Sequence, residues 1–394
     1  MYAIIGVVLL IVVIAILLFI FVKRRLDTDT TGVFDYIISG KGGGVNPNRD
    51  LKAQVSQIGI DRKREISRKS FVVKDEIGSG NFGKVYKGKV NALDGTKSKT
   101  IVAIKSITDS VDNEEIKNFL YEIKIMGFID PHLNLVSMVG SCTSELGKTN
   151  QAWLLLEFCD HGDLKQYLIT HKQEILSEET EALNTRCLVM WAYDVAKGMQ
   201  YLSDKKIMHG DLAARNVLLD DDPNKSGYLV AKVADFGLSR KFYENVTYEK
   251  QNRLLVPWKW MAFEYVMNEI LMLQSDVWSY GVFFWEIFSF AQVPYGHQTF
   301  EEVLEKLKDG YRLPCPEDVQ SILSWSPPML YVNVSKLCFI ENPHERGSFG
   351  DIIELLEKEL AYTERRQYSE RYEEYQKNQA KDYLAIGGSK FFLL

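Results

Sequence analysis

The chain has 394 residues, of which 46% are hydrophobic and 25% charged, the balance of a globular protein with a buried core and two or three folding units. Its formal net charge is −6, without the clustered excess of Lys and Arg that nucleic-acid binders carry, so we expect no nucleic-acid partner. The five cysteines include no C-x-x-C spacing, which argues against a zinc site or a disulfide framework and favours reduced thiols.

The first residues in chain order predict a membrane span. Residues 2–22 contain no charge and no proline, and a helix of that length rises about 30 Å, enough to cross a hydrocarbon core. In a cleaved signal peptide the basic residues precede a shorter apolar run, whereas here the basic cluster at residues 23–25 follows it. By the positive-inside rule this cluster keeps the rest of the chain in the cytoplasm. We therefore expect one uncleaved transmembrane helix at residues 1–22 with almost nothing outside; a longer protein with an ectodomain is the alternative.

Residues 23–70 predict a polar cytoplasmic linker next to the membrane. The run GKGGG at residues 40–44 is typical of a flexible segment. A basic patch at residues 62–64 and 68–69 is either solvated or lies against anionic lipid.

From Phe71 the pattern becomes that of an α+β protein. Alternating or β-branched runs at residues 71–78, 84–90 and 101–107 predict strands, and an amphipathic helix is expected at residues 113–128. The inward face of that helix consists of Ile116, Phe119, Leu120, Ile123 and Met126. The remainder of the domain is mainly helical in pattern, as in MWAYDVAKGMQYL and SDVWSYGVFFWEIF. Strands first and helices after them indicate two unequal lobes.

The last residues, 361–394, are charged and rich in tyrosine. They include good helix formers but offer no broad apolar face to a core. We therefore expect a partly disordered tail, with a solvated helix as the alternative.

The run GSGNFGKV at residues 78–85 points to a phosphate-binding loop. Its glycines let a strand–turn–strand backbone approach phosphates without side-chain collision. A dinucleotide-binding turn shares the glycine spacing but continues as a helix, whereas here the strand run KVYKGKV follows. The dinucleotide alternative is therefore disfavoured.

Three further elements follow that loop in order. VAIK places Lys105 on a strand, and Glu122 on the inward face of the next helix is the candidate countercharge, because both residues have apolar neighbours. HGDLAARN at residues 209–216 combines a His, an Asp and an Asn in one loop. Asp235 begins DFG directly after the strand run YLVAKVA, and a carboxylate at a strand end suits Mg²⁺.

In this order the four elements resemble a protein kinase domain, and the resemblance covers residues 71–360. It continues in PWKWMAFE, SDVWSYG and NPHERGSF, which are similar to the end of an activation segment, the helix after it and a late arginine element. The resemblance implies a bilobal fold with a small β-rich N-lobe and a larger helical C-lobe. Ala213 and Arg215 follow the loop Asp in the AAR arrangement of tyrosine kinases, and the preceding membrane span makes the match a receptor-type tyrosine kinase.

The resemblance implies ATP as the phosphate donor, with Mg²⁺ or Mn²⁺ bound beside it. The catalytic residues that it implies are Asp211 as the base, Lys105, Glu122 and Arg215. The implied metal ligands are Asn216 and Asp235. The residues implied to surround ATP are Gly78, Ser79, Gly80, Gly83, Val85, Ala103, Lys105, Leu156, Glu157, Cys159 and Leu218.

The resemblance also implies partners and a location. The chain is expected to act on protein tyrosines, to associate with itself for trans-autophosphorylation, and to lie in the plasma membrane as a single-pass protein with a cytoplasmic kinase domain. Phosphorylated tail tyrosines would be docking sites for SH2-domain proteins; a solvated tail without such a role is the alternative. The candidate docking residues are Tyr368, Tyr372, Tyr375 and Tyr383. The expected segments are a membrane helix (1–22), a juxtamembrane segment (23–70), a kinase domain (71–360) and a tail (361–394).

One residue of the catalytic loop departs from the family pattern. Gly210 stands where the family has the Arg that pairs with a phosphorylated activation-loop residue. Without that Arg, a phosphate on Tyr243 or Tyr248 loses one charge-assisted partner, so the change is expected to affect regulation more than chemistry.

Two other departures leave the enzyme reading intact. Phe263 and Gly347 each replace a common Pro, yet Glu264 and Arg346 remain, so their ion pair is expected to form. The main alternative function is a pseudokinase that serves as a scaffold, and its usual mark, a missing Lys, Asp or metal ligand, is not found. A serine/threonine kinase is the second alternative, and the AAR arrangement argues against it.

Overall fold

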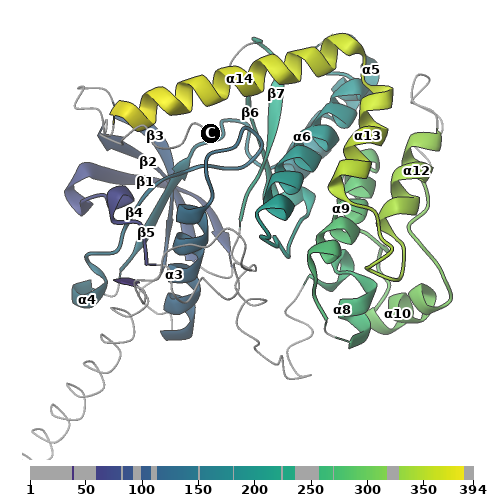
Figure 1. Cartoon of the computed structure of the whole chain (residues 1–394), viewed down its shortest axis with the longest axis horizontal. Coiled ribbons are helices and arrows are strands. Elements are labelled where there is room, and N and C mark those ends of the chain that lie inside the picture. Colours follow the sequence, from purple (N-terminus) through teal and green to yellow (C-terminus); the bar gives the residue numbers. More distant parts are fainter. Residues whose placement is uncertain are drawn as a thin grey trace, which may run out of the picture.

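The computed structural model shows a β-rich lobe beside a larger helical lobe (Figure 1). The residues that it describes are 38–39, 59–80, 83–91, 99–107, 113–149, 151–180, 182–222, 225–235, 257–268, 270–316 and 328–385. The predicted α+β fold with two unequal lobes is confirmed. The expected membrane helix at residues 1–22 lies outside the described residues, and within them no helix has both the length and the apolar character to cross a bilayer.

The N-lobe is built on a five-stranded antiparallel sheet with the strand order β1-β2-β3-β5-β4. Its strands are β1 (Phe71–Gly80), β2 (Gly83–Asn91), β3 (Lys99–Ser106), β4 (Met138–Cys142) and β5 (Trp153–Glu157). The first three correspond to the three predicted strands. The predicted helix is α3 (Asn113–Phe128), and all five residues of its expected inward face are buried. A short helix, α4 (Leu146–Thr149), follows β4.

The residues before β1 pack on the N-lobe, so the prediction of a flexible linker is wrong for residues 59–70. They include the short 3-10 turns η1 (Arg62–Arg64) and η2 (Arg68–Ser70). The side chain of Ile66 is buried, and its N–H donates to the carbonyl of Ser141 in β4 at 2.6 Å. The Glu65 carboxylate accepts the N–H of Thr143 at 2.7 Å. Arg68 of the basic patch lies over the ring of Phe71, 4.7 Å from its centroid, so this residue packs on protein.

The C-lobe is arranged around the buried helix α9 (Leu273–Phe288). Its helices are α5 (Leu164–Ser177), α6 (Thr185–Asp204), α8 (Phe263–Asn268), α9 (Leu273–Phe288), α10 (Phe300–Lys308), α12 (Pro328–Cys338) and α13 (Phe349–Glu359). A two-stranded sheet of β6 (Val217–Asp221) and β7 (Leu229–Val233) completes it. All residues from 275 to 288 of α9 are buried, as expected for a helix that is apolar on every side. The five cysteines are free, as predicted.

The tail forms a long helix, α14 (Tyr362–Ala385), which crosses the top of both lobes in Figure 1. The prediction of partial disorder is therefore wrong for these residues. Tyr368 and Arg371 are each only 5% exposed, and Tyr372 and Tyr375 are half-buried, so these three tyrosines are covered when the helix is docked, and their role as docking sites stays a prediction. The packed face was missed because it consists of tyrosines and an arginine, which a search for an apolar stripe does not count.

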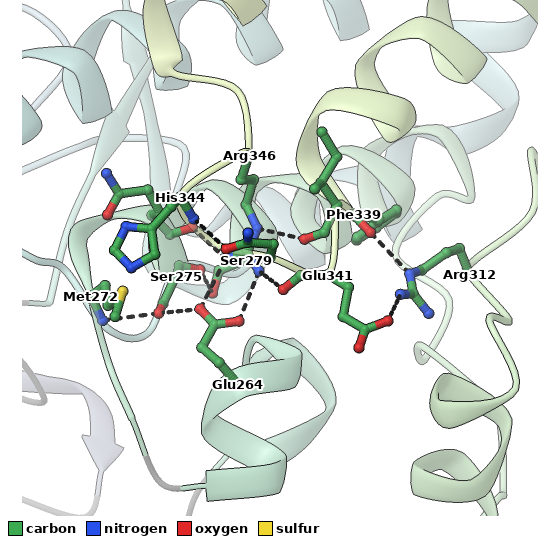
Figure 2. Close-up of polar contacts among 12 residues, drawn as sticks. Glu264, Met272, Ser275, Ser279, Arg312, Phe339, Glu341, His344 and Arg346 are labelled. Atoms are coloured by element: carbon green, nitrogen blue, oxygen red, sulfur yellow. Dashed lines mark hydrogen bonds and ion pairs between the residues drawn. The ribbon is translucent and has the colours of Figure 1, made fainter.

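The expected ion pair between Glu264 and Arg346 forms and is buried (Figure 2). The two guanidinium NH groups of Arg346 donate to the two carboxylate oxygens of Glu264 at 2.9 and 2.8 Å. Ser275 of α9 donates to the same carboxylate at 2.7 Å, and Arg346 also donates to the carbonyl of Ile340 at 3.0 Å. This bidentate geometry fixes α8 to the loop before α13.

Candidate active site

The sheet register aligns the residues expected to surround ATP. Gly78 of β1 pairs with Val85 of β2, which in turn pairs with Lys105 of β3. In the neighbouring pair of strands, Ala103 lies opposite Leu156 of β5. One row of the sheet therefore connects the glycine loop to the lysine, and the next strand over leads to the connection between the lobes.

The glycines of the loop differ in their surroundings. Gly83 has a φ of 136°, and a Cβ there would meet the carbonyl oxygen of Ser106 at 2.2 Å, so only glycine fits. A Cβ on Gly78 would meet nothing within 4 Å, which leaves open space above the sheet at that point. Ser79 and Gly80 continue the hairpin and pair with the β2 residues at 84 and 83.

Lys105 lies between two carboxylates, one from each lobe. Its Nζ donates to Glu122 Oε1 of α3 at 2.6 Å, the predicted contact, and to Asp235 Oδ1 at 3.2 Å. Burial alone would lower the pKa of Lys105, but the two carboxylates outweigh it and raise the pKa above its usual value. Asp235 is more exposed than its partners and has a left-handed φ of 61°, a conformation that costs energy and clusters at functional sites.

The loop at residues 209–216 holds Asp211, Arg215 and Asn216 together. Arg215 NH2 donates to Asp211 Oδ1 at 2.5 Å, and Asn216 Nδ2 donates to Asp211 Oδ2 at 2.9 Å. Both partners lie in or beside the turn η3 (Ala214–Asn216). Burial raises the pKa of Asp211 to about 6, against the opposing effect of the Arg215 guanidinium. The carboxylate is therefore charged at neutral pH and still basic enough to accept a proton.

The backbone of that loop is fixed by its own His209 and by Asp276, which we did not single out from the sequence. Asp276 of α9 accepts the N–H of His209 at 2.7 Å and that of Gly210 at 2.8 Å. The His209 ring bridges the N–H of Asp211, at 3.2 Å, and the carbonyl of Ala234, at 3.0 Å. Gly210 has a φ of 78°, so the residue that replaces the family Arg occupies a left-handed turn at no steric cost.

A second carboxylate of α9 connects the catalytic loop to the segment at residues 257–261. Glu286 Oε2 accepts the backbone N–H of Ala214 and the indole N–H of Trp260, each at 2.9 Å. The Arg215 guanidinium lies 4.4 Å from the centroid of the Trp260 ring. Burial raises the pKa of Glu286 to about 7. A signal for both missed carboxylates exists in the sequence, because an Asp and a Glu inside an otherwise apolar helix need buried partners.

Three of the residues expected to surround ATP, Leu156, Cys159 and Leu218, come together between the lobes. Cys159 is buried in a small apolar cluster with Val136 and Ala234, and Leu156 and Leu218 pack against it. This cluster joins β5, β6 and the residue before Asp235 in one apolar surface, which suits a flat heterocycle.

The side chain of Glu157 has a role outside that surface. Its carboxylate accepts the N–H of Ser137 at 2.6 Å and the Nζ of Lys232 at 2.8 Å. Its backbone N–H donates to the carbonyl of Ser137 at 3.0 Å, so the group of Glu157 left for a nucleotide base is its backbone carbonyl.

The donor set fits ATP with a divalent cation. Asp235 and Asn216 supply oxygen atoms, the ligands that Mg²⁺ prefers. A hydrogen bond from the N–H of Ala234, the residue before Asp235, to the Asn216 carbonyl at 2.8 Å keeps the two residues near each other. The open space above Gly78 and the ammonium group of Lys105 suit phosphates. Within the described part of the chain no cluster of three or more His, Cys, Asp or Glu residues offers another metal site. Phe236, Gly237 and the loop tyrosines at 243 and 248 lie outside that part.

The two lobes, the Lys–Glu pair and the Asp-containing loop between them define a protein kinase domain. A family model described as "Protein tyrosine and serine/threonine kinase" matches residues 71–356, and the chain belongs to this family. Chance similarity of single motifs is thereby excluded as an explanation of the arrangement.

Among curated relatives, the chain is similar to "Tyrosine kinase receptor Cad96Ca" of Drosophila melanogaster, with 34% identity over 292 residues, 73% of this chain and 35% of that protein. It is also 32% identical to "Fibroblast growth factor receptor 1" of Pleurodeles waltl, over 78% of this chain and 37% of that protein. A third relative, "Fibroblast growth factor receptor" of Ciona intestinalis, is 32% identical over 78% of this chain and 40% of its own length. The chain thus spans 35–40% of the length of these relatives, all of which are named as receptors and the first as a tyrosine kinase receptor.

Proposed function

We propose that this chain is a membrane-anchored protein-tyrosine kinase that transfers the γ-phosphate of ATP to protein tyrosines in receptor-type signalling, including tyrosines on copies of itself. The observation that carries the proposal is the Lys105 ammonium group held between Glu122 and Asp235, at 2.6 and 3.2 Å. It joins the two lobes at a point next to the loop that contains Asp211 and Asn216.

The proposed mechanism divides the work of phosphoryl transfer, which depends on positioning and charge neutralisation, among these residues. Lys105 orients the α- and β-phosphates and is itself kept in place by Glu122. Asp235 and Asn216 hold Mg²⁺ or Mn²⁺, which when bound neutralises phosphate charge. Asp211 orients the acceptor hydroxyl and takes its proton, and a pKa near 6 keeps it ionised for that purpose at neutral pH.

Tyrosine is the proposed acceptor because of the residues around Asp211. Serine/threonine kinases generally carry a Lys two residues after this Asp, whereas the residue here is the fully buried Ala213. Arg215, four residues after the Asp, stacks on Trp260 of the segment at residues 257–261. That contact supports a platform for a peptide next to the catalytic loop.

The membrane location rests on the apolar run at residues 1–22 and the basic cluster after it. Asn245 and Asn333 each begin an Asn-x-Ser/Thr sequence, the acceptor pattern for N-glycosylation. With the kinase domain in the cytoplasm, neither asparagine would receive a glycan. Mass spectrometry of the protein from eukaryotic cells tests this orientation, and a glycan on either asparagine would refute it.

The test of the catalytic assignment is phosphorylation of the chain and of a tyrosine peptide with Mg-ATP and with Mn-ATP. Asp211→Asn and Lys105→Met should each abolish transfer, while Lys117→Met should not change it, because this half-buried lysine of α3 contacts only Glu114 of the same helix among the charged residues that the structure describes. Unfolding curves check that all variants are folded. Unchanged turnover in Lys105→Met would refute the assignment of the catalytic residues. Phosphoserine on the chain would contradict the proposed specificity for tyrosine.

A pseudokinase scaffold is the second candidate. It predicts nucleotide binding or partner binding without transfer, and thus the same absence of product in the native chain and in Asp211→Asn. The complete set of polar residues around Lys105 and Asp211 favours the enzyme.

A further inference from the structure

Helix α14 contacts both lobes. In Figure 1 it begins beside α13 of the C-lobe, passes β6 and β7, and ends above the N-lobe sheet. Near its start, Glu364 accepts two hydrogen bonds from the guanidinium of Arg186 in α6, both at 2.8 Å. Three turns further on, the hydroxyl of Tyr375 lies 2.9 Å from the hydroxyl of Ser137, the residue directly before β4. A single helix therefore joins the two lobes.

Beyond Glu364, four residues of α14 also face the protein, and we call them the strap face: Tyr368, Arg371, Tyr372 and Tyr375. Their spacing places them on one side of a helix. Tyr368 donates to Asn134 Oδ1 at 2.8 Å, in the loop between α3 and β4. Arg371 pairs with two buried carboxylates of the C-lobe, Asp222 at 3.2 Å and Asp194 at 3.5 Å.

The end of the strap face lies against the connection between the lobes. The Nζ of Lys232 is 5.5 Å from the centroid of the Tyr375 ring and 2.8 Å from the carboxylate of Glu157 at the end of β5. The same carboxylate accepts the N–H of Ser137, whose hydroxyl contacts Tyr375. The cation beside Tyr375 is thus already neutralised by a carboxylate.

We propose that α14 is a strap that binds both lobes and that Tyr375 is a phosphorylation site whose modification detaches the strap. The modification step rests on the proposed tyrosine kinase activity and is carried out by a second copy of the chain. The phenolic oxygen of Tyr375 attacks the γ-phosphorus of ATP, the bond to the β–γ bridging oxygen breaks, and ADP leaves with that electron pair. The phenolic proton passes to the active-site base of the second copy, Asp211.

A phosphate at this position is incompatible with the docked helix for three reasons. The 2.9 Å contact with Ser137 leaves no room for a phosphoryl group on the oxygen. The site is half-buried, so a group carrying about two negative charges would lose solvation. The Glu157 carboxylate repels the phosphate, and Lys232, which could attract the phosphate, is already paired with that carboxylate. The phenol itself shows the same preference, because burial and then Glu157 raise the pKa of Tyr375 to about 12.

The consequence is a tail with two exclusive states. In the docked state the tyrosines of the strap face are covered and the loop before β4 is held. In the phosphorylated state the same tyrosines are presented to phosphotyrosine-binding domains. A partner can then bind the tail only after the strap has left the lobes.

The release is tested without relying on the enzyme's own activity. Full-length Asp211→Asn protein is made with phosphotyrosine incorporated at position 375, and hydrogen exchange is compared with the unphosphorylated protein. Exchange in residues 132–139 and 362–378 should become faster by on the order of tenfold. Phosphotyrosine at position 362, where the native Tyr362 is 71% exposed, is the matched control and should change neither segment. Equal protection with and without phosphate at position 375 would overturn the proposal.

The modification is tested separately by incubating Asp211→Asn protein with the active chain and Mg-ATP, in the presence of a tyrosine peptide. Phosphate on Tyr375, found by mass spectrometry, supports the proposal. A phosphorylated peptide with unmodified Tyr375 overturns the site while leaving the proposed activity intact. Absence of phosphate on both peptide and chain contradicts the proposed activity itself, and the exchange experiment still judges the strap.

Discussion

Replacement of Arg346 by Met tests how far the C-lobe depends on one buried ion pair (Figure 2). The Arg346 side chain is 0% exposed and that of Glu264 is 8% exposed. Removing the guanidinium leaves Glu264 with Ser275 at 2.7 Å as its remaining partner in Figure 2. In the native protein Arg346 also donates to the carbonyls of Ile340 and Gln274, at 3.0 and 2.8 Å, and the substitution removes both hydrogen bonds. Breaking a buried pair in this way costs about 3–5 kcal/mol.

The measurement is the free energy of unfolding from urea denaturation, with the melting temperature as a second readout. Arg346→Met should lower the melting temperature by roughly 5–15 °C. Lys358→Met is the control, since that lysine forms an exposed pair with Glu354 in which the side chains are 62% and 71% exposed. Its loss should not be measurable. The double variant Arg346→Met with Glu264→Leu should recover part of the loss, because no buried charge is left unpaired.

The pH dependence gives a second check on the same pair. Burial raises the pKa of Glu264, but the hydrogen bonds from Arg346 and Ser275 outweigh it, and the pKa is lowered below its usual value. A lowered pKa in the folded state stabilises the protein above the unfolded pKa of about 4.3, and this contribution is lost as the pH falls through the folded value. The difference in the free energy of unfolding between the native protein and Arg346→Met should therefore become smaller below about pH 4.3. A small loss in Arg346→Met at neutral pH, similar to that of Lys358→Met, would refute the reasoning.

Three further predictions concern the catalytic loop. Gly210→Ala should lower the free energy of unfolding by about 1–2 kcal/mol in urea denaturation, because Gly210 has a φ of 78°; an unchanged value would mean that the turn relaxes. The rate with a tyrosine peptide should fall about tenfold per pH unit below pH 6, as Asp211, whose pKa is about 6, becomes protonated; a flat profile would exclude it as the base. Tyr243→Phe with Tyr248→Phe should lower peptide phosphorylation only modestly, since the Arg that would read the phosphate is absent, and a large loss would show that another cation receives it.

The sequence predicted those elements whose signal is local. The helix at residues 113–128 was predicted with its bounds and its buried face because its apolar residues follow the helical period. Lys105 and Glu122 were paired because each is charged in an apolar run, and a buried charge needs a partner. The kinase motifs have fixed order and spacing, which is why the two-lobe fold followed from them.

The missed features depend on contacts between distant parts of the chain. Tyr375 meets Ser137 across 238 positions, and no pattern within the tail indicates which surface its tyrosines will cover. Asp276 receives two backbone N–H groups from a loop more than sixty residues earlier. Glu65 likewise finds its partners in β4 and the turn after it, so a segment with linker composition becomes part of the N-lobe. Such partners are fixed by the fold as a whole.

Helix α9 connects the loop that contains Asp211 to the proposed peptide platform at residues 257–261. Ser279 donates to the carbonyl of Trp260 at 2.9 Å, Glu286 accepts from the indole of the same residue, and Asp276 holds the loop backbone. These side chains come from one helix whose residues 275–288 are all buried, and closely packed interiors transmit displacement instead of absorbing it. A shift of α9 would therefore move the proposed base, Asp211, and the proposed platform by similar amounts and preserve their relative geometry. Ser275 of the same helix contacts the Glu264–Arg346 pair, so that pair stabilises the scaffold from which the active site is built.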